Sequence, residues 1–78
     1  MSRKIYQIAA DISADWHKPN YGAAPYLAAM QELDDINGRY YEDSAKSVVL
    51  YFLANASTWR GENAKRLKAE LKALAGVK

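Results

Sequence analysis

The stretch that decides the fold reads SAKSVVLYFLANA, residues 44–56, and includes the uninterrupted apolar run from Val48 to Ala54. Such β-branched and aromatic residues are also common in strands. The flanking Ala, Lys and Asn residues extend the pattern past the length of a strand, however, which favours a helix. Because apolar residues would cover nearly its whole circumference, we expect this helix to be the central and most buried one, with Asp43 or Ser44 as its N-cap.

Two helices are predicted before this stretch, because apolar residues recur there at helical spacing. The first covers 4–17 and ends before Pro19, since a residue that precedes proline is pushed out of the helical region. The second covers 25–36, with Pro25 in a first turn that does not need the missing N–H. We expect Gly38 to end the second helix by adopting the left-handed conformation.

A fourth helix is predicted over 59–75, where the apolar residues recur at alternating steps of three and four. Ser57 or Thr58 is expected to cap its start, and Gly76 to end it. Trp59 directly follows this capping pair, so we expect its ring to be buried at the junction of the last two helices.

The four segments predict a single all-α domain over residues 1–78, folded as a compact bundle of about four short helices. The apolar stripes of the helices give the expected core: Ile8, Ile12, Trp16, Leu27, Met30, Leu33, Val48, Val49, Phe52, Leu53, Leu67, Leu71 and Leu74.

The composition excludes several kinds of chemistry. The chain has no cysteine, so it holds neither disulfides nor thiolate-bound metal. His17 is the only histidine, and neither a phosphate-binding glycine loop nor a nucleophile elbow is present. We therefore expect no enzyme activity, no metal and no cofactor. A catalytic pair of His17 and Asp15 is an alternative that rests on their proximity alone.

No apolar run is long enough to span a membrane, and the N-terminus lacks the apolar region of a signal peptide. We therefore expect a cytoplasmic protein that does not bind membranes.

Charge is sorted along the chain, although the net charge is only +2. Residues 31–43 hold five carboxylates and Arg39, a net charge of −4, whereas residues 60–78 hold six cations and two carboxylates, a net charge of +4. These segments are either solvated faces that attract each other, each exposed pair contributing about 0–1 kcal/mol, or surfaces for a charged partner.

Tyrosine is unusually frequent, with six residues in a chain of 78. Tyr6, Tyr26 and Tyr51 fall in predicted helices, where we expect their rings to pack on the core. The loop tyrosines, which are Tyr21, Tyr40 and Tyr41, can equally pack or bind a partner, since tyrosine is enriched in binding hot spots.

Three stretches, Asp43–Ser47, Tyr51–Glu62 and Ala64–Lys72, give the chain its most distinctive pattern. In these stretches the chain resembles small proteins that recur in bacteriophages, prophages and other mobile elements. Ile5–Ala9 with Asp15 and Trp16, and Pro25–Leu27 with Met30, fit the same resemblance, which therefore covers nearly the whole chain. The resemblance implies an accessory protein of such an element that acts in a bacterial host cell, of the class that includes inhibitors of host defence systems such as CRISPR–Cas complexes and restriction enzymes.

The function predicted from the sequence is that of an inhibitor or adaptor that binds a larger host protein. Its expected binding residues are Tyr21, Tyr40, Tyr41, Arg60, Lys65, Arg66 and Lys68. The alternative is a nucleic-acid-binding domain, in which the cations of the last helix, including Lys72, contact phosphates.

Overall fold

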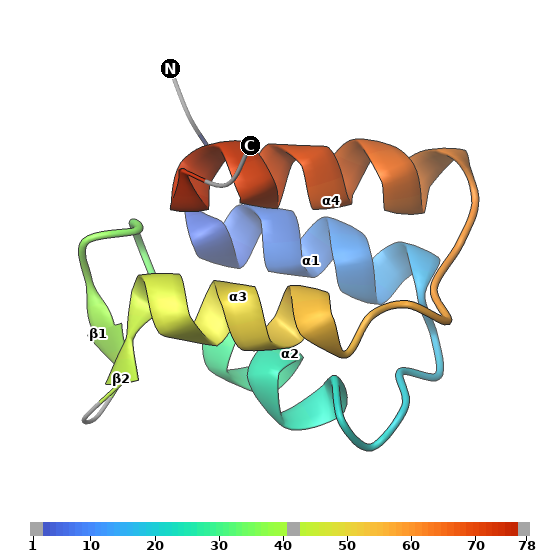
Figure 1. The fold of residues 1–78 in the computed structure, drawn as a ribbon, viewed down its shortest axis with the longest axis horizontal. Helices are drawn as coiled ribbons and strands as arrows, with labels where there is room; N and C mark the ends of the chain where they lie inside the picture. The colour runs from blue at the N-terminus through green and yellow to red at the C-terminus, as the bar shows by residue number, and fades with distance from the viewer. Residues whose placement is uncertain (1–2, 41–42, 77–78) are drawn as a thin grey trace.

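The computed structural model describes residues 3–40 and 43–76, and these residues form four helices and one short antiparallel strand pair (Figure 1). The elements are α1 (Ile5–Asp15), α2 (Ala24–Met30), β1 (Arg39–Tyr40), β2 (Asp43–Ser44), α3 (Ala45–Ala54) and α4 (Glu62–Ala75). The predicted all-α fold is therefore confirmed.

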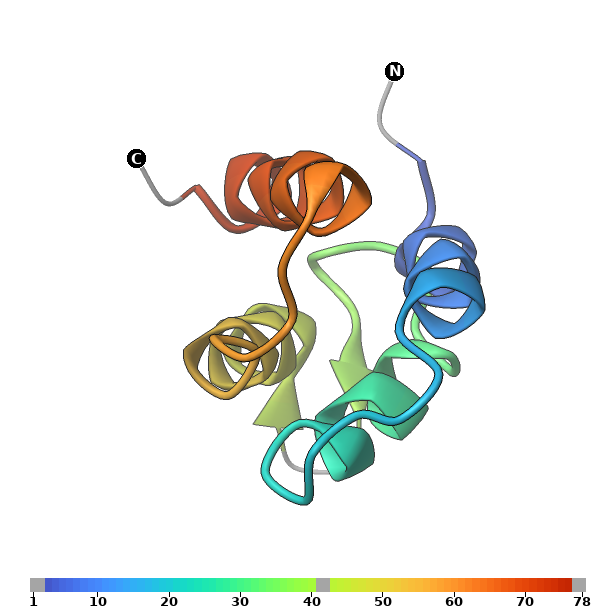
Figure 2. The ribbon, with the colours of Figure 1, turned by 90° about the vertical axis from the view of Figure 1, so that its right-hand side faces the viewer.

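The helices pack as a ring around one core. Each helix contacts two neighbours, in the order α1, α4, α3, α2 and back to α1. Figure 2 shows this arrangement end-on, with α1 and α3 on opposite sides and α4 above them.

The core contains every residue that the sequence predicts for it, with Trp16, Leu53 and Leu74 half-buried at its edge. The sequence analysis missed the small residues. Ala9, Ala45 and Ala64 are 1% exposed or less, because small side chains let the short helices approach closely.

The expectation that α3 is a central, all-round buried helix is wrong. Val48, Val49 and Phe52 are buried, but Leu50 and Tyr51 are exposed. In a ring of four helices every helix keeps an outer side, so apolar residues around the whole circumference of α3 leave two of them at the surface.

The second helix ends at Met30, six residues before the predicted Ile36. The residues that follow α2 supply acceptors to the first N–H groups of α1, which have no partner within their own helix. The carbonyl oxygen of Leu33 accepts from the N–H of Tyr6 at 2.9 Å, and that of Asp34 accepts from the N–H of Ile5 at 2.8 Å.

The segment that follows α2 is a turn and not a helix end. The N–H of Asn37 donates to the side chain of Asp35, and the N–H of Gly38 donates to its carbonyl oxygen. Gly38 therefore does not adopt the predicted left-handed conformation, which is found at Gly76 with a φ of 76°. Ser44 caps α3 as predicted, by accepting from the N–H of Ser47.

Two helix boundaries near the tryptophans also differ from the prediction. Helix α1 ends at Asp15 and not at residue 17, because Trp16 turns into an extended conformation. Helix α4 begins at Glu62 and not at residue 59, with Gly61 at its N-cap and a φ of 116°. Ser57 and Thr58 therefore do not cap α4.

Candidate binding surfaces

Trp59 is buried at the junction of α3 and α4, as the sequence predicts, and is 3% exposed. Its ring stacks on Trp16 with centroids 5.5 Å apart and an angle of 3° between the planes. Phe52 meets both indoles edge-on, at 6.2 and 6.4 Å. The three rings fix the segment that leads into α4.

Asp15, the last residue of α1, ties this junction to α4. Its carboxylate accepts from Nδ2 of Asn63 at 3.0 Å and from Nε1 of Trp59 at 2.8 Å. These two hydrogen bonds lower the pKa of Asp15 below its ordinary value, and the bond from Asn63 has the larger effect. The ring of His17 instead contacts the carbonyl oxygen of Ala14 at 2.6 Å, near the helix end.

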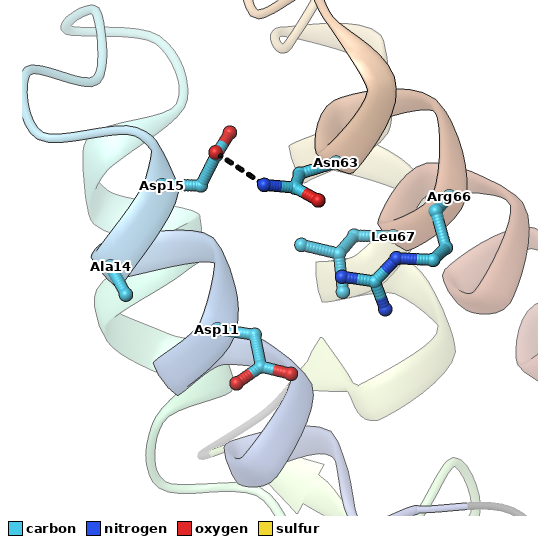
Figure 3. A pocket seen from close by; sticks show the side chains of 6 residues that line it. All are labelled: Asp11, Ala14, Asp15, Asn63, Arg66 and Leu67. Atoms are coloured by element: carbon cyan, nitrogen blue, oxygen red, sulfur yellow. Dashed lines mark hydrogen bonds between the residues drawn. The ribbon is translucent and has the colours of Figure 1, made fainter.

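A pocket of about 270 Å³ lies between α1 and α4 next to this carboxylate. Figure 3 shows Asp11 and Asp15 on its α1 side, and Asn63 and Arg66 on its α4 side. The pocket therefore has charges of both signs. Arg66, one of the predicted binding residues, faces these carboxylates from the opposite wall.

Arg3 closes the other end of the interface between α1 and α4. Its guanidinium donates two hydrogen bonds to Glu70, of 2.7 and 2.9 Å, and a third to Asp11. The hydrogen bond with Glu70, and after it the one with Asp11, raises the pKa of Arg3, and the bonds from Arg3 lower the pKa of Glu70.

The acidic segment 31–43 also contacts α1. The carbonyl oxygens of Leu33 and Asp34 accept hydrogen bonds from the first N–H groups of that helix.

Three of the predicted cations line a second depression, at the start of α4. Arg60, Lys65 and Lys68 line it together with Trp59, Gly61 and Ala64, and its volume is about 320 Å³. We call it the cationic depression. The ammonium of Lys68 donates to the carbonyl oxygen of Trp59 at 2.6 Å and lies 5.6 Å from the centroid of the indole.

A surface of aromatic and aliphatic side chains lies on α2 and α3. Tyr26 and Tyr51 stack with their centroids 5.4 Å apart and their planes at 28°. Tyr51 is nonetheless 52% exposed, and the neighbouring Leu50 is 36% exposed. We call these three residues, together with Tyr21, the aromatic face.

We include Tyr21 in this face because its loop is hydrogen-bonded to the end of α3. Asn20 donates from Nδ2 to the carbonyl oxygen of Asn55 and to the hydroxyl of Thr58, and its Oδ1 accepts from the N–H of Ala23. Asn55 lies one helical turn beyond Tyr51. Tyr21 itself is 98% exposed, so an ordered loop presents its ring to solvent.

The predicted binding residues do not form one patch. Arg60, Lys65 and Lys68 lie together, and Arg66 lies on the opposite side of α4. Tyr21 lies near the C-terminal end of α3, whereas Tyr40 belongs to β1, beside the N-terminal end of that helix (Figure 1). Tyr41 lies outside the described residues.

Leu50 and Tyr51 are the surface residues that sequence reasoning missed, since Tyr51 was expected to pack its ring on the core. A signal for both existed in the sequence. The helical periodicity of α3 places Val48, Val49 and Phe52 on one side, which faces the core. Leu50 and Tyr51 therefore fall on the sides of the helix that face away from the core.

No family model, curated protein or solved structure matches this chain. Within residues 3–40 and 43–76, no group of three His, Cys, Asp or Glu side chains is placed to hold a metal ion. The helices of that same part of the chain are all too short or too polar to cross a membrane.

Proposed function

We propose that this protein is a non-catalytic binding module that attaches to a larger protein through the aromatic face. The observation that carries the proposal is the exposed, stacked pair of Tyr26 and Tyr51, with Leu50 beside it and Tyr21 on an ordered loop.

Rigid aromatic side chains favour binding for a physical reason. A tyrosine offers a large contact area and loses little conformational entropy when it is fixed. Stacking on Tyr26 restricts Tyr51 before any partner arrives, so less freedom remains to be lost on binding. The hydroxyl groups can still form hydrogen bonds with a polar rim of the partner.

The partner class comes from the sequence resemblance to small proteins of bacteriophages and mobile elements. We propose that the partner is a protein of a bacterial host, with defence complexes such as CRISPR–Cas or restriction enzymes as the first to test. A small module without catalysis would modulate such a complex by occupying part of its surface.

The experiment is affinity purification of the tagged protein from a bacterial host lysate, followed by mass spectrometry and titration with the purified partner. Tyr51→Ala should weaken binding by about 2 kcal/mol, a dissociation constant roughly 30-fold higher, as for a hot-spot residue. Tyr6→Ala is the matched control, because Tyr6 is an exposed tyrosine of α1 outside the aromatic face.

Charge changes should have a different effect from tyrosine changes. Lys65→Ala/Arg66→Ala should mainly slow association with the protein partner. Nucleic-acid binding through α4 is the alternative, and it predicts the opposite pattern: loss of cations should weaken binding most, and loss of tyrosines should hardly change it.

The proposal fails if no stoichiometric protein partner is recovered, or if folded Tyr21→Ala and Tyr51→Ala variants both bind it like wild type. Tyr40→Ala/Tyr41→Ala tests whether these two predicted contacts take part.

A further inference from the structure

Asn37 differs from the other asparagines in the surroundings of its side-chain amide. Each of the others donates a hydrogen bond from Nδ2 to an oxygen of the protein: Asn20, Asn55 and Asn63. Within residues 3–40 and 43–76, no hydrogen bond reaches the side-chain amide of Asn37, and the residue is exposed. Asn37 is also the asparagine that a glycine follows, whereas tyrosine or alanine follows the others.

The backbone nitrogen of Gly38 is a nucleophile in the right covalent position to attack this free amide. After its proton is lost to hydroxide, the nitrogen forms a bond to Cγ of Asn37, and ammonia leaves. Glycine has no Cβ, so no side chain obstructs this approach. Water then opens the resulting succinimide ring at either carbonyl, which leaves an aspartyl or an isoaspartyl link at position 37.

The turn that begins at Asp35 restrains this nucleophile. The N–H of Gly38 donates to the carbonyl oxygen of Asp35 at 3.0 Å, and the N–H of Asn37 donates to the Asp35 carboxylate at 2.8 Å. The nitrogen of Gly38 is therefore available for attack only while the turn is open. An exposed turn opens at a much lower free-energy cost than the whole domain, so the turn slows the attack without preventing it.

We infer that Asn37 is a site of spontaneous deamidation, with water as the co-reactant, and that the Asp35 turn sets its rate. The product adds a sixth carboxylate to residues 31–43, which hold five. The isoaspartyl link also lengthens the backbone directly before Gly38, whose carbonyl oxygen accepts from the N–H of Ala45 at 2.8 Å. The modification therefore reaches the start of α3. It does not depend on the aromatic face or on any partner.

The test is incubation of the intact protein at about pH 8 and 37 °C, followed by peptide mapping with mass spectrometry. The three hydrogen-bonded asparagines are internal standards in the same sample. Asn37 should lose ammonia at least tenfold faster than any of them and give isoaspartyl as well as aspartyl product. In ¹⁵N-labelled protein, the amide resonance of Ala45 should shift with the same time course.

Asp35→Ala removes the acceptor of the Asn37 N–H and should speed the loss of ammonia at least threefold, because the turn opens more often. Asp34→Ala is the matched control. It removes the same charge from the neighbouring exposed position and should change the rate less than twofold. The inference is overturned if Asn37 is modified no faster than the internal standards, if only aspartyl product forms, or if the two variants react at the same rate.

Discussion

The indole of Trp59 donates from Nε1 to Oδ2 of Asp15 across 2.8 Å, and this bond joins residues 44 positions apart. It links the buried aromatic junction to the end of α1, while Asn63 links the same carboxylate to α4. The bond therefore fixes the start of α4, where the cationic depression lies.

Trp59 should fluoresce as a buried indole. In Trp16→Phe, Trp59 is the remaining tryptophan, and phenylalanine keeps a ring in the stacking position. We expect an emission maximum at shorter wavelength than that of free tryptophan, since Trp59 is shielded from water. An emission maximum equal to that of free tryptophan would show that this residue is hydrated.

Asn63→Ala should raise the pKa of Asp15 toward the ordinary value of about 3.9, because the hydrogen bond from Asn63 is the main cause of its lowering. The measurement is an NMR titration of the Asp15 carboxyl carbon in both proteins. Equal midpoints would mean that Asn63 does not stabilise the ionised form.

The same shift predicts a loss of stability in acid. The pKa of Asp15 is lower in the folded state than in the unfolded chain, so its ionised form favours folding. This contribution is complete above about pH 4–5 and disappears as the pH falls through the folded pKa. Urea unfolding from pH 6 to pH 2.5 should show a shallower loss for Asn63→Ala than for wild type.

Phe52→Ala should reduce the free energy of unfolding by about 3–5 kcal/mol, because Phe52 is fully buried against both tryptophans. Leu50→Ala is the matched control on the outer side of α3 and should change it by about 0.5 kcal/mol. If the two variants melt at similar temperatures, the assigned orientation of α3 is incorrect.

Gly22→Ala should destabilise the loop that carries Tyr21. A Cβ at Gly22 would overlap Oδ1 of Asn55, and the Asn55 side chain is held by its bond to the carbonyl oxygen of Tyr51. We expect a loss of about 1–3 kcal/mol in the free energy of unfolding. In an Asn55→Ala background the same change should cost much less. An equal cost in both backgrounds would exclude this contact as the cause.

The helices could be predicted from the sequence because each has an apolar stripe, and Trp59 because it lies between two such stripes. The early end of α2 could not, since Leu33 and Asp34, which were expected inside that helix, instead offer their carbonyl oxygens to the start of a helix distant in sequence. The start of α4 could not be predicted either. The helix begins at Glu62 and not at residue 59, because Trp59 belongs to the buried junction that precedes the helix.

The candidate surfaces were less predictable, because they depend on which elements become neighbours. Helical spacing places Lys65 and Lys68 on one side of α4 and Arg66 on another, but that Arg66 faces Asp11 and Asp15 depends on the position of α1. The stacking of Tyr26 on Tyr51 requires α2 and α3 to be adjacent, which neither segment encodes alone.

The most direct measurement of the central claim is hydrogen–deuterium exchange of the protein, free and bound to its purified protein partner. Binding through the aromatic face should slow exchange in residues 20–27 and 47–55, and leave residues 60–72 nearly unchanged. Protection confined to residues 60–72, with residues 20–27 and 47–55 exchanging as in the free protein, would contradict the proposed binding surface.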